Sequence, residues 1–152
     1  MSELKEVEIY TDGACAGNPG PGGWGTILCY NGKEKELSGG EKNTTNNRME
    51  LMAVIEGLKA LKYPCRVKVV SDSAYVCDGF NKGWVYSWEK KDWMRTKKDP
   101  VKNPDLWKEL LELTRIHEVT FEWVKGHNDH PYNERCDKLA VEQSEKFIKQ
   151  EN

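Results

Sequence analysis

The chain has 152 residues, of which 38% are hydrophobic and 10% aromatic, and its formal net charge at pH 7 is −2. This length fits one domain with its own core, and no apolar run approaches the ~20 residues that cross a membrane. The charged N-terminus lacks the apolar core of a signal peptide, so we expect a cytoplasmic protein with a single domain over residues 1–152.

The cysteines form an odd set without a CxxC pair: Cys15, Cys29, Cys65, Cys77 and Cys136. This pattern argues against a disulfide framework and against a structural zinc site. His127, His130 and Cys136 are close in sequence, but no fourth ligand lies near them. We therefore expect reduced, separately packed thiols.

The first predicted strand alternates Val7 and Ile9 with glutamates and leads to Asp12. Five glycines and two prolines then lie between Gly13 and Gly23, which predicts a loop whose main chain can pass close to a partner. Asp12 either caps the amides of this loop or belongs to a site. The residues of this stretch alone leave both interpretations open.

A hairpin is predicted next. Residues 24–30 and 33–37 form its two strands, and Asn31-Gly32 forms the tight turn between them. Gly39-Gly40 is expected to end the second strand. The sheet should therefore start as an antiparallel meander of three strands.

The clearest helix is predicted over residues 48–61, with N-cap residues in the segment 44–47 before it. Its buried stripe includes Val54 and Leu58. Glu50 lies one turn before Val54, so its carboxylate projects from the apolar side. An ionised carboxylate in that position is costly unless it is paired or bound to a cation.

Residues 66–71 form a predicted strand that leads to Asp72, and residues 73–79 form a short helix after it. Asp72 thus repeats the strand-end position of Asp12. Ligand sites of open α/β sheets form beyond the carboxyl ends of the strands. Two parallel strands connected through the Glu50 helix would place both acids at one edge.

The segment from Lys82 to Lys102 combines seven basic residues with three acidic ones, and four aromatic residues are interleaved with them. Lysines attract phosphate, and tryptophan faces stack on sugars or bases. The alternative for the tryptophans is a local hydrophobic cluster, and we expect some of them to form one.

The rest of the chain predicts a helix over residues 103–113, a strand over 119–124, a polar loop over 125–131 and a final helix over 132–149. Residues 143–152 are the charged tail of that helix. One helix face carries Asp137, Ala140, Val141, Ser144 and Ile148. An acid therefore lies on an apolar stripe here as well.

Four carboxylates stand out by position: Asp12, Glu50, Asp72 and Asp137. Each one alone could cap local amides or pair with a neighbouring cation. If the four converge, their repulsion forces protonation unless cations neutralise them. Oxygen ligands of this kind suit Mg²⁺ or Mn²⁺, and pairs of such cations ~3.5–4 Å apart assist displacement at phosphodiesters. His127 is either an ordinary loop histidine or a proton shuttle near such a site.

These residues belong to five blocks, residues 9–13, 45–51, 72–73, 123–127 and 133–137, that resemble the signature of ribonuclease H type 1. The resemblance covers nearly the whole chain in order. It implies an α/β fold with a five-stranded mixed sheet, three antiparallel strands followed by parallel strands, flanked by helices. It also implies a monomeric endonuclease that cleaves the RNA strand of RNA–DNA hybrids and leaves 5′-phosphate and 3′-hydroxyl ends.

By the same resemblance, Asp12, Glu50, Asp72 and Asp137 are metal ligands for two Mg²⁺ ions, for which Mn²⁺ can substitute, and His127 is the catalytic histidine of a flexible loop. Substrate contacts are also implied. The residues expected to read the RNA strand are Cys15, Asn18, Asn46, Asn47, Arg48 and Glu50. A pocket for a DNA phosphate is expected to include Thr45 and Asn103. The basic protrusion that grips the DNA strand is expected to use Trp84, Trp88, Lys90, Lys91, Trp93, Lys97 and Lys98.

The chain departs from this family pattern at two positions. Ala74 stands where many relatives carry a Gln that reaches the substrate, and Asn43 stands where an Arg is frequent, although Lys42 is adjacent. We therefore expect one contact to the RNA strand to be absent because of Ala74, and contacts to the DNA strand to be weaker because of Asn43. Two rival interpretations are a DNA-cutting recombinase nuclease and a hybrid-binding module without catalysis. The Asn46-Asn47-Arg48 block and the His127 loop speak against the first, and the four acids speak against the second.

Overall fold

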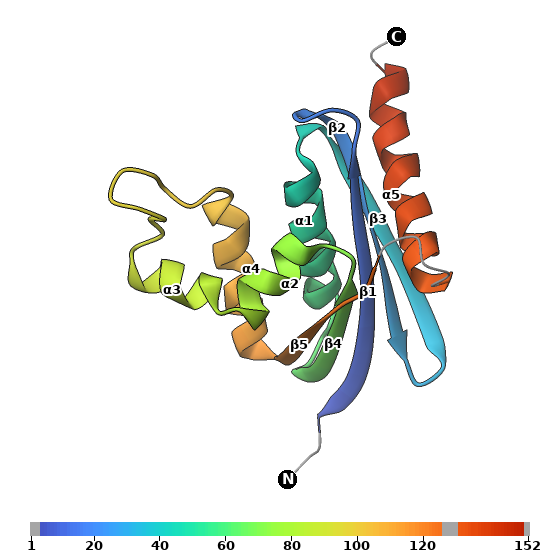
Figure 1. The fold of residues 1–152 in the computed structure, drawn as a ribbon. Coiled ribbons are helices and arrows are strands. Elements are labelled where there is room, and N and C mark those ends of the chain that lie inside the picture. The colour runs from blue at the N-terminus through green and yellow to red at the C-terminus, as the bar shows by residue number, and fades with distance from the viewer. Residues whose placement is uncertain (1–3, 126–130, 151–152) are drawn as a thin grey trace.

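The computed structural model describes residues 4–125 and 131–150. The elements are β1 (Lys5–Cys15), β2 (Gly20–Tyr30), β3 (Lys33–Thr44), α1 (Asn46–Lys59), β4 (Cys65–Ser71), α2 (Ala74–Asn81), α3 (Trp84–Lys90), α4 (Pro104–Ile116), β5 (Glu118–Trp123) and α5 (Pro131–Gln150), as Figure 1 shows. Within the described ranges, no helix is long and apolar enough to cross a membrane.

The strands form one five-stranded sheet in the order β3-β2-β1-β4-β5. The first three strands pair antiparallel, whereas β1 pairs parallel with β4 and β4 pairs parallel with β5. This topology confirms the predicted α/β fold with a mixed sheet. Thr11 lies opposite Ser71 in the parallel pair, so Asp12 and Asp72 follow at neighbouring positions of the same sheet edge.

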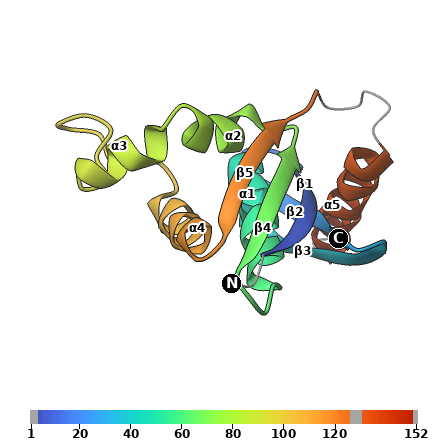
Figure 2. The ribbon, with the colours of Figure 1, turned by 90° about the horizontal axis from the view of Figure 1, so that it is seen from below.

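The two faces of the sheet carry separate hydrophobic cores. Ile9 and Tyr10 are adjacent in β1, so their side chains point to opposite faces. Ile9 belongs to the larger core, which includes residues of α1 and α4, and Tyr10 packs with Ile27, Val70 and Cys136 of α5. Figures 1 and 2 accordingly show α1 and α5 on opposite sides of the sheet.

The glycine-rich segment after Asp12 is mostly strand, so the prediction of a long loop is wrong. β1 continues to Cys15, β2 begins at Gly20, and only residues 16–19 connect them. Gly39-Gly40 does not end β3, which continues to Thr44. The predicted tight turn is confirmed, because Asn31 and Gly32 have left-handed φ values of 51° and 80°.

The glycines of β2 serve the packing of helix α5. A Cβ atom added to Gly23 would collide with the carbonyl oxygen of Ala140, and one added to Gly25 would collide with that of Cys136. The missing side chains let α5 lie directly on β2. The partner that these two glycines approach is therefore a helix of the same chain.

Helix α1 is stabilised by an N-cap and by a buried apolar stripe, as its sequence indicates. Thr45 is its N-cap, and Thr45 Oγ1 accepts a hydrogen bond of 3.2 Å from the backbone N–H of Arg48. Val54 and Leu58 are buried in the core. Glu50 is also buried, which confirms that this acid projects from the apolar side. The helix ends at Lys59, two residues before the predicted end.

The predicted buried face of the last helix is only partly right. Ala140 and Ser144 are buried, but the stripe continues through Cys136, and Ile148 is 37% exposed. Asp137 is only partly buried. The small residues of this helix pack on glycines, so its sequence carries too few large apolar side chains to define the buried stripe.

His117 is a buried titratable residue that follows α4. Its Nδ1 accepts a hydrogen bond of 3.0 Å from the backbone N–H of Cys65. Burial lowers the pKa of His117 below its usual value, because the imidazolium ion loses its hydration there. The folded protein therefore holds this imidazole neutral at a pH where the unfolded chain binds a proton.

The stability of the protein should fall on mild acidification because of His117. Its contribution is fully present above the unfolded pKa of about 6.5 and is lost as the pH falls from there through the lower folded pKa. His117→Asn places an acceptor oxygen near Nδ1 but does not titrate. We expect the free energy of unfolding in urea to fall less for His117→Asn than for the wild type between about pH 7.5 and about pH 5.5. Equal losses would contradict this role.

Candidate metal centre

Three carboxylates meet where the parallel strands β1 and β4 end. Asp12 lies on β1, Glu50 lies in the first turns of α1, and Asp72 directly follows β4. One ligand oxygen of each lies within 4.8 Å of the others. Asp12 and Glu50 are only 4% and 3% exposed, whereas Asp72 is more open to solvent.

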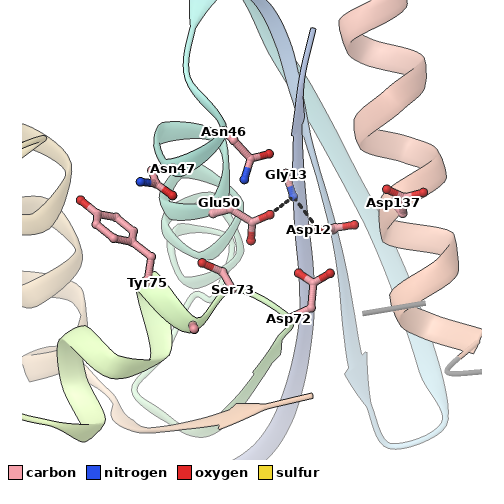
Figure 3. A pocket seen from close by; sticks show the side chains of 10 residues that line it. Asp12, Gly13, Asn46, Asn47, Glu50, Asp72, Ser73, Tyr75 and Asp137 are labelled. Atoms are coloured by element: carbon pink, nitrogen blue, oxygen red, sulfur yellow. Dashed lines mark hydrogen bonds between the residues drawn. The ribbon is translucent and has the colours of Figure 1, made fainter. Parts of the chain in front are cut away.

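Asp137 faces this group from helix α5, on the opposite side of Asp12 from Glu50 (Figure 3). It is not part of the tight group of three, but it lines the same open pocket. The full lining is Asp12, Gly13, Asn46, Asn47, Glu50, Asp72, Ser73, Ala74, Tyr75 and Asp137. The structure therefore brings all four predicted acids to one pocket, which we call the acid pocket.

Burial and repulsion between like charges both raise the pKa of two acids in the acid pocket, Asp12 and Glu50. Burial raises the pKa of Asp12 well above its usual value, and the charges of Glu50 and Asp72 raise it further. Burial also raises the pKa of Glu50, with a second contribution from the charge of Asp72. Asp12 and Glu50 therefore bind protons more tightly in the absence of cations than free carboxylates do, and a bound cation would compete with those protons.

The backbone N–H of Gly13 fixes two of these acids. It donates to Asp12 Oδ1 at 2.9 Å and to Glu50 Oε1 at 2.8 Å. A Cβ atom at position 13 would lie 2.6 Å from the backbone nitrogen of Glu50, so only glycine allows this approach. The sequence led us to expect that the main chain at Gly13 approaches an RNA backbone, whereas its two hydrogen bonds to Asp12 and Glu50 were not predicted.

The second oxygen of Glu50 is the one available to a cation. Glu50 Oε2 is buried and has no hydrogen-bond donor among the described residues. A buried carboxylate oxygen without a donor is costly unless a cation binds it. Among the described residues, the side chains that line the acid pocket offer carboxylate, amide and hydroxyl oxygens as metal ligands, and no sulfur or imidazole nitrogen. This donor set fits a hard divalent cation and does not fit zinc, which prefers nitrogen and sulfur ligands.

The residues expected to read RNA lie in three different places. Asn46 and Asn47 are exposed and line the acid pocket, as predicted for substrate contact. Cys15 and Asn18 do not line it: Asn18 is exposed in the β1–β2 connection, and Cys15 Sγ faces the carbonyl oxygen of Thr44 at 3.3 Å. Thr45, which was expected in the pocket for a DNA phosphate, uses its side chain as the N-cap of α1.

Arg48 and Asn103 belong to a network that the sequence analysis missed. The guanidinium of Arg48 donates to both carboxylate oxygens of Asp105, at 3.1 and 2.8 Å, and to Asn103 Oδ1 at 3.2 Å. Asn103 in turn donates to the hydroxyl of Tyr75 at 3.2 Å. These contacts connect α1, α2 and the start of α4. These hydrogen bonds join residues far apart in the chain, so no local sequence pattern predicts them.

The basic protrusion consists of α3 and the segment that follows it, and Figure 1 shows it extending away from the sheet. Lys90, Lys91, Lys97 and Lys98 are all exposed on it. Its tryptophans differ in their exposure to solvent. Trp84 is 39% exposed, whereas Trp88 and Trp93 pack against the core. This confirms that some tryptophans form a local cluster, and Trp84 is the more exposed ring.

His127 lies outside the described residues, and so does His130. The predicted catalytic role of His127 therefore stays a prediction. All five cysteines are free thiols, and Cys136 Sγ donates to the carbonyl oxygen of Tyr10 at 3.2 Å.

Comparisons with known sequences agree on one family. The family model of RNase H matches residues 4–145. A ribonuclease H from Caldanaerobacter subterraneus subsp. tengcongensis is 60% identical over 144 residues, which is 95% of this chain and 94% of that protein. A ribonuclease H from Erythrobacter litoralis is also 60% identical and covers 91% of this chain and 96% of its own length.

Solved structures agree with the sequence comparison. The crystal structure of LC9-RNase H1, a type 1 RNase H with the type 2 active-site motif, matches with a TM-score of 0.86 and 33% identity, over 96% of this chain and 75% of that chain. LC11-RNase H1, solved in complex with an RNA/DNA hybrid, matches with a TM-score of 0.67 and 26% identity, over 93% of this chain and 99% of that chain.

Proposed function

The chain belongs to the ribonuclease H family, as a type 1 member, and we propose that it hydrolyses the RNA strand of RNA–DNA hybrids at the acid pocket. The observation that carries this proposal is the cluster of Asp12, Glu50 and Asp72, whose ligand oxygens lie within 4.8 Å of one another. The cluster occurs in a chain that is 60% identical to ribonucleases H over nearly its full length.

The four acids of the pocket would hold two Mg²⁺ ions, or Mn²⁺ in their place. Such cations neutralise the charge of a phosphodiester and lower the pKa of an attacking water. The protein supplies the fixed geometry: the Gly13 N–H orients Asp12 and Glu50, which leaves Glu50 Oε2 for a cation. Asp72 and Asp137, which are less buried, complete the ligand set from β4 and α5. Hydrolysis would leave 5′-phosphate and 3′-hydroxyl ends.

Recognition of the RNA strand falls to amide groups beside the acids. Asn46 and Asn47 are exposed at the start of α1 and line the pocket. An amide both donates and accepts hydrogen bonds, as a 2′-hydroxyl does, so this pair can tell RNA from DNA. The lysines of the basic protrusion would attract the phosphates of the DNA strand, with a dependence on salt. We further propose that the enzyme acts as a monomer in the cytoplasm.

A single assay tests the proposed function. The protein is incubated with Mg²⁺ and an end-labelled RNA–DNA hybrid, duplex DNA or duplex RNA. We expect cleavage of the RNA strand of the hybrid alone, and removal of the cation with EDTA should stop it. Cleavage of duplex DNA would favour a recombinase-type nuclease. Tight binding of the hybrid without cleavage, in Mg²⁺ and in Mn²⁺, would contradict the proposal.

A further inference from the structure

Trp123 is the last residue of β5 and is not among the residues that line the acid pocket. Because β5 pairs parallel with β4, both strands end at the sheet edge that carries this pocket. Trp123 lies opposite Ser71, the residue directly before Asp72. Its side chain therefore stands beside the metal centre, although an indole N–H only donates and cannot bind a cation.

The indole of Trp123 extends the hydrogen bonds between β4 and β5 by one residue. The backbone N–H of Val124 donates to the carbonyl oxygen of Ser71 at 2.9 Å. Trp123 Nε1 donates to the next carbonyl oxygen, that of Asp72, at 3.0 Å. Asp72 lies between the end of β4 and Ser73, the N-cap of α2. The indole therefore holds the main chain of a metal ligand that lies beyond its strand.

Burial does not explain the presence of this large ring. Trp123 is 52% exposed, and it belongs to none of the hydrophobic cores of the described ranges. A tryptophan stabilises a protein mainly through the apolar area that it buries. The hydrogen bond to Asp72 is therefore the interaction that distinguishes tryptophan from a smaller residue at this position.

Asp72 is the acid that repulsion displaces most easily. Its carboxylate lies within 4.8 Å of those of Asp12 and Glu50, measured between one ligand oxygen of each. Asp12 and Glu50 are buried and both accept from the N–H of Gly13, whereas Asp72 is more open to solvent. Like charges at this distance push the least buried group outward unless a cation is bound. A restraint on the main chain of Asp72 opposes this displacement.

We propose that Trp123 is a positioning residue whose indole N–H holds Asp72 in its ligand position before a cation binds, and so raises the affinity of the acid pocket for Mg²⁺. The inference rests on the proposed function, because the cations are those of the proposed reaction. A fixed carbonyl group restrains the ψ angle of Asp72, and with it the direction of the carboxylate. A ligand that is already in place loses less conformational freedom when the cation binds.

Trp123→Phe removes the donor and keeps an aromatic ring. The affinity for Mg²⁺ is measured without nucleic acid, from the NMR shift of the Gly13 amide, which contacts two of the acids. We expect the Kd for Mg²⁺ to rise about fivefold, the scale of one hydrogen bond. In hybrid cleavage, the half-saturating Mg²⁺ concentration should rise similarly, while kcat at saturating Mg²⁺ and KM for the hybrid change by less than about twofold.

Trp123→His tests whether the N–H matters and not the ring. The five-membered rings of the two residues are attached alike, so histidine Nε2 falls where tryptophan Nε1 lies and donates when it carries the proton. At about pH 8 the imidazole is neutral, and we expect a Kd for Mg²⁺ close to that of the wild type. Trp123→Leu is a second variant without a donor, for use if Trp123→Phe does not fold.

A double-mutant cycle shows whether Trp123 acts through Asp72. In the Asp72→Asn background, the charge that Trp123 positions is absent. Trp123→Phe should therefore leave the Kd for Mg²⁺ unchanged in that background. An equal rise in Kd in both backgrounds overturns the inference, and so does a Kd for the single variant Trp123→Phe that equals that of the wild type.

Mg²⁺ binding and hybrid cleavage separate this inference from the proposed function. If the wild type cleaves the hybrid but Trp123→Phe binds Mg²⁺ as tightly, the inference fails and the proposed function stands. If the wild type binds Mg²⁺ through Asp72 but cleaves no hybrid, the proposed function fails, and the positioning role is still decided by the Kd values. A wild type that binds no Mg²⁺ would overturn both.

Discussion

Asp12→Asn is expected to abolish hybrid cleavage and at the same time to increase the free energy of unfolding. Asp12 is buried beside Glu50 and Asp72, so its charge is needed to bind cations, and without cations the protein loses stability either by ionising Asp12 or by keeping it protonated. Loss of a ligand should lower kcat by about 10³-fold or more, which corresponds to several kcal/mol of transition-state stabilisation. Asp72→Asn should lose activity similarly, with a smaller gain in stability because this side chain is less buried.

These two effects are measured separately. Initial cleavage rates in Mg²⁺ report on the cations, and urea unfolding in EDTA reports on the repulsion between the acids. Glu56→Gln is a matched control, because it removes a carboxylate from the same helix as Glu50, where it pairs with Lys59 at 3.8 Å. Both properties should stay close to wild type in this control. If Asp12→Asn or Asp72→Asn keeps most of its activity, the metal assignment is wrong.

Gly25→Ala is expected to destabilise the protein and to reduce kcat as well. The added Cβ would collide with the carbonyl oxygen of Cys136 and lie 2.7 Å from Leu139 Cβ. Helix α5 would have to move away from β2, at a cost of about 3 kcal/mol on the scale of overpacked cores. Asp137 directly follows Cys136, so this movement would also take a carboxylate away from the acid pocket.

Gly32→Ala distinguishes this steric effect from a general intolerance of alanine. Gly32 has a φ of 80°, but its Cβ would meet no atom within 4 Å. Alanine there should cost about 1–2 kcal/mol through its left-handed backbone and leave kcat unchanged. Thermal or urea unfolding and hybrid cleavage measure both variants. A Gly25→Ala protein as stable and active as the wild type would show that α5 does not depend on this close approach.

Much of the metal centre could be predicted because its signals are local. The apolar period of α1 shows that Glu50 projects inward, and Asp12 and Asp72 each follow an alternating or apolar strand. Asp137 was singled out from a helix face that the structure confirms only in part, and the resemblance to a known family implied its role as a metal ligand. The hydrogen bonds of the Gly13 N–H to two carboxylates were not predicted, because they depend on the approach of α1 to β1.

The substrate side was less predictable from local signals. Arg48 was expected to contact RNA, but its guanidinium binds Asp105, which lies 57 residues further along the chain. Tyr75 accepts hydrogen bonds from Asn103 and Trp107, which lie 28 and 32 residues further along the chain. Such contacts depend on how helices pack. Residue type and spacing do not encode them directly.

The opening stretch of the chain shows how far a sequence determines structure by itself. Alternation, turn chemistry and capping are interactions between near neighbours, so the first strand, the Asn31-Gly32 turn and the Thr45 cap follow from the residues alone. The tertiary structure decided what the glycines do. Glycine is typical of both a loop and a closely approached strand, and the choice depends on whether a distant segment needs the space. Here α5 occupies the space next to Gly23 and Gly25. These glycines are therefore strand residues that let α5 pack closely and bring Asp137 to the acid pocket.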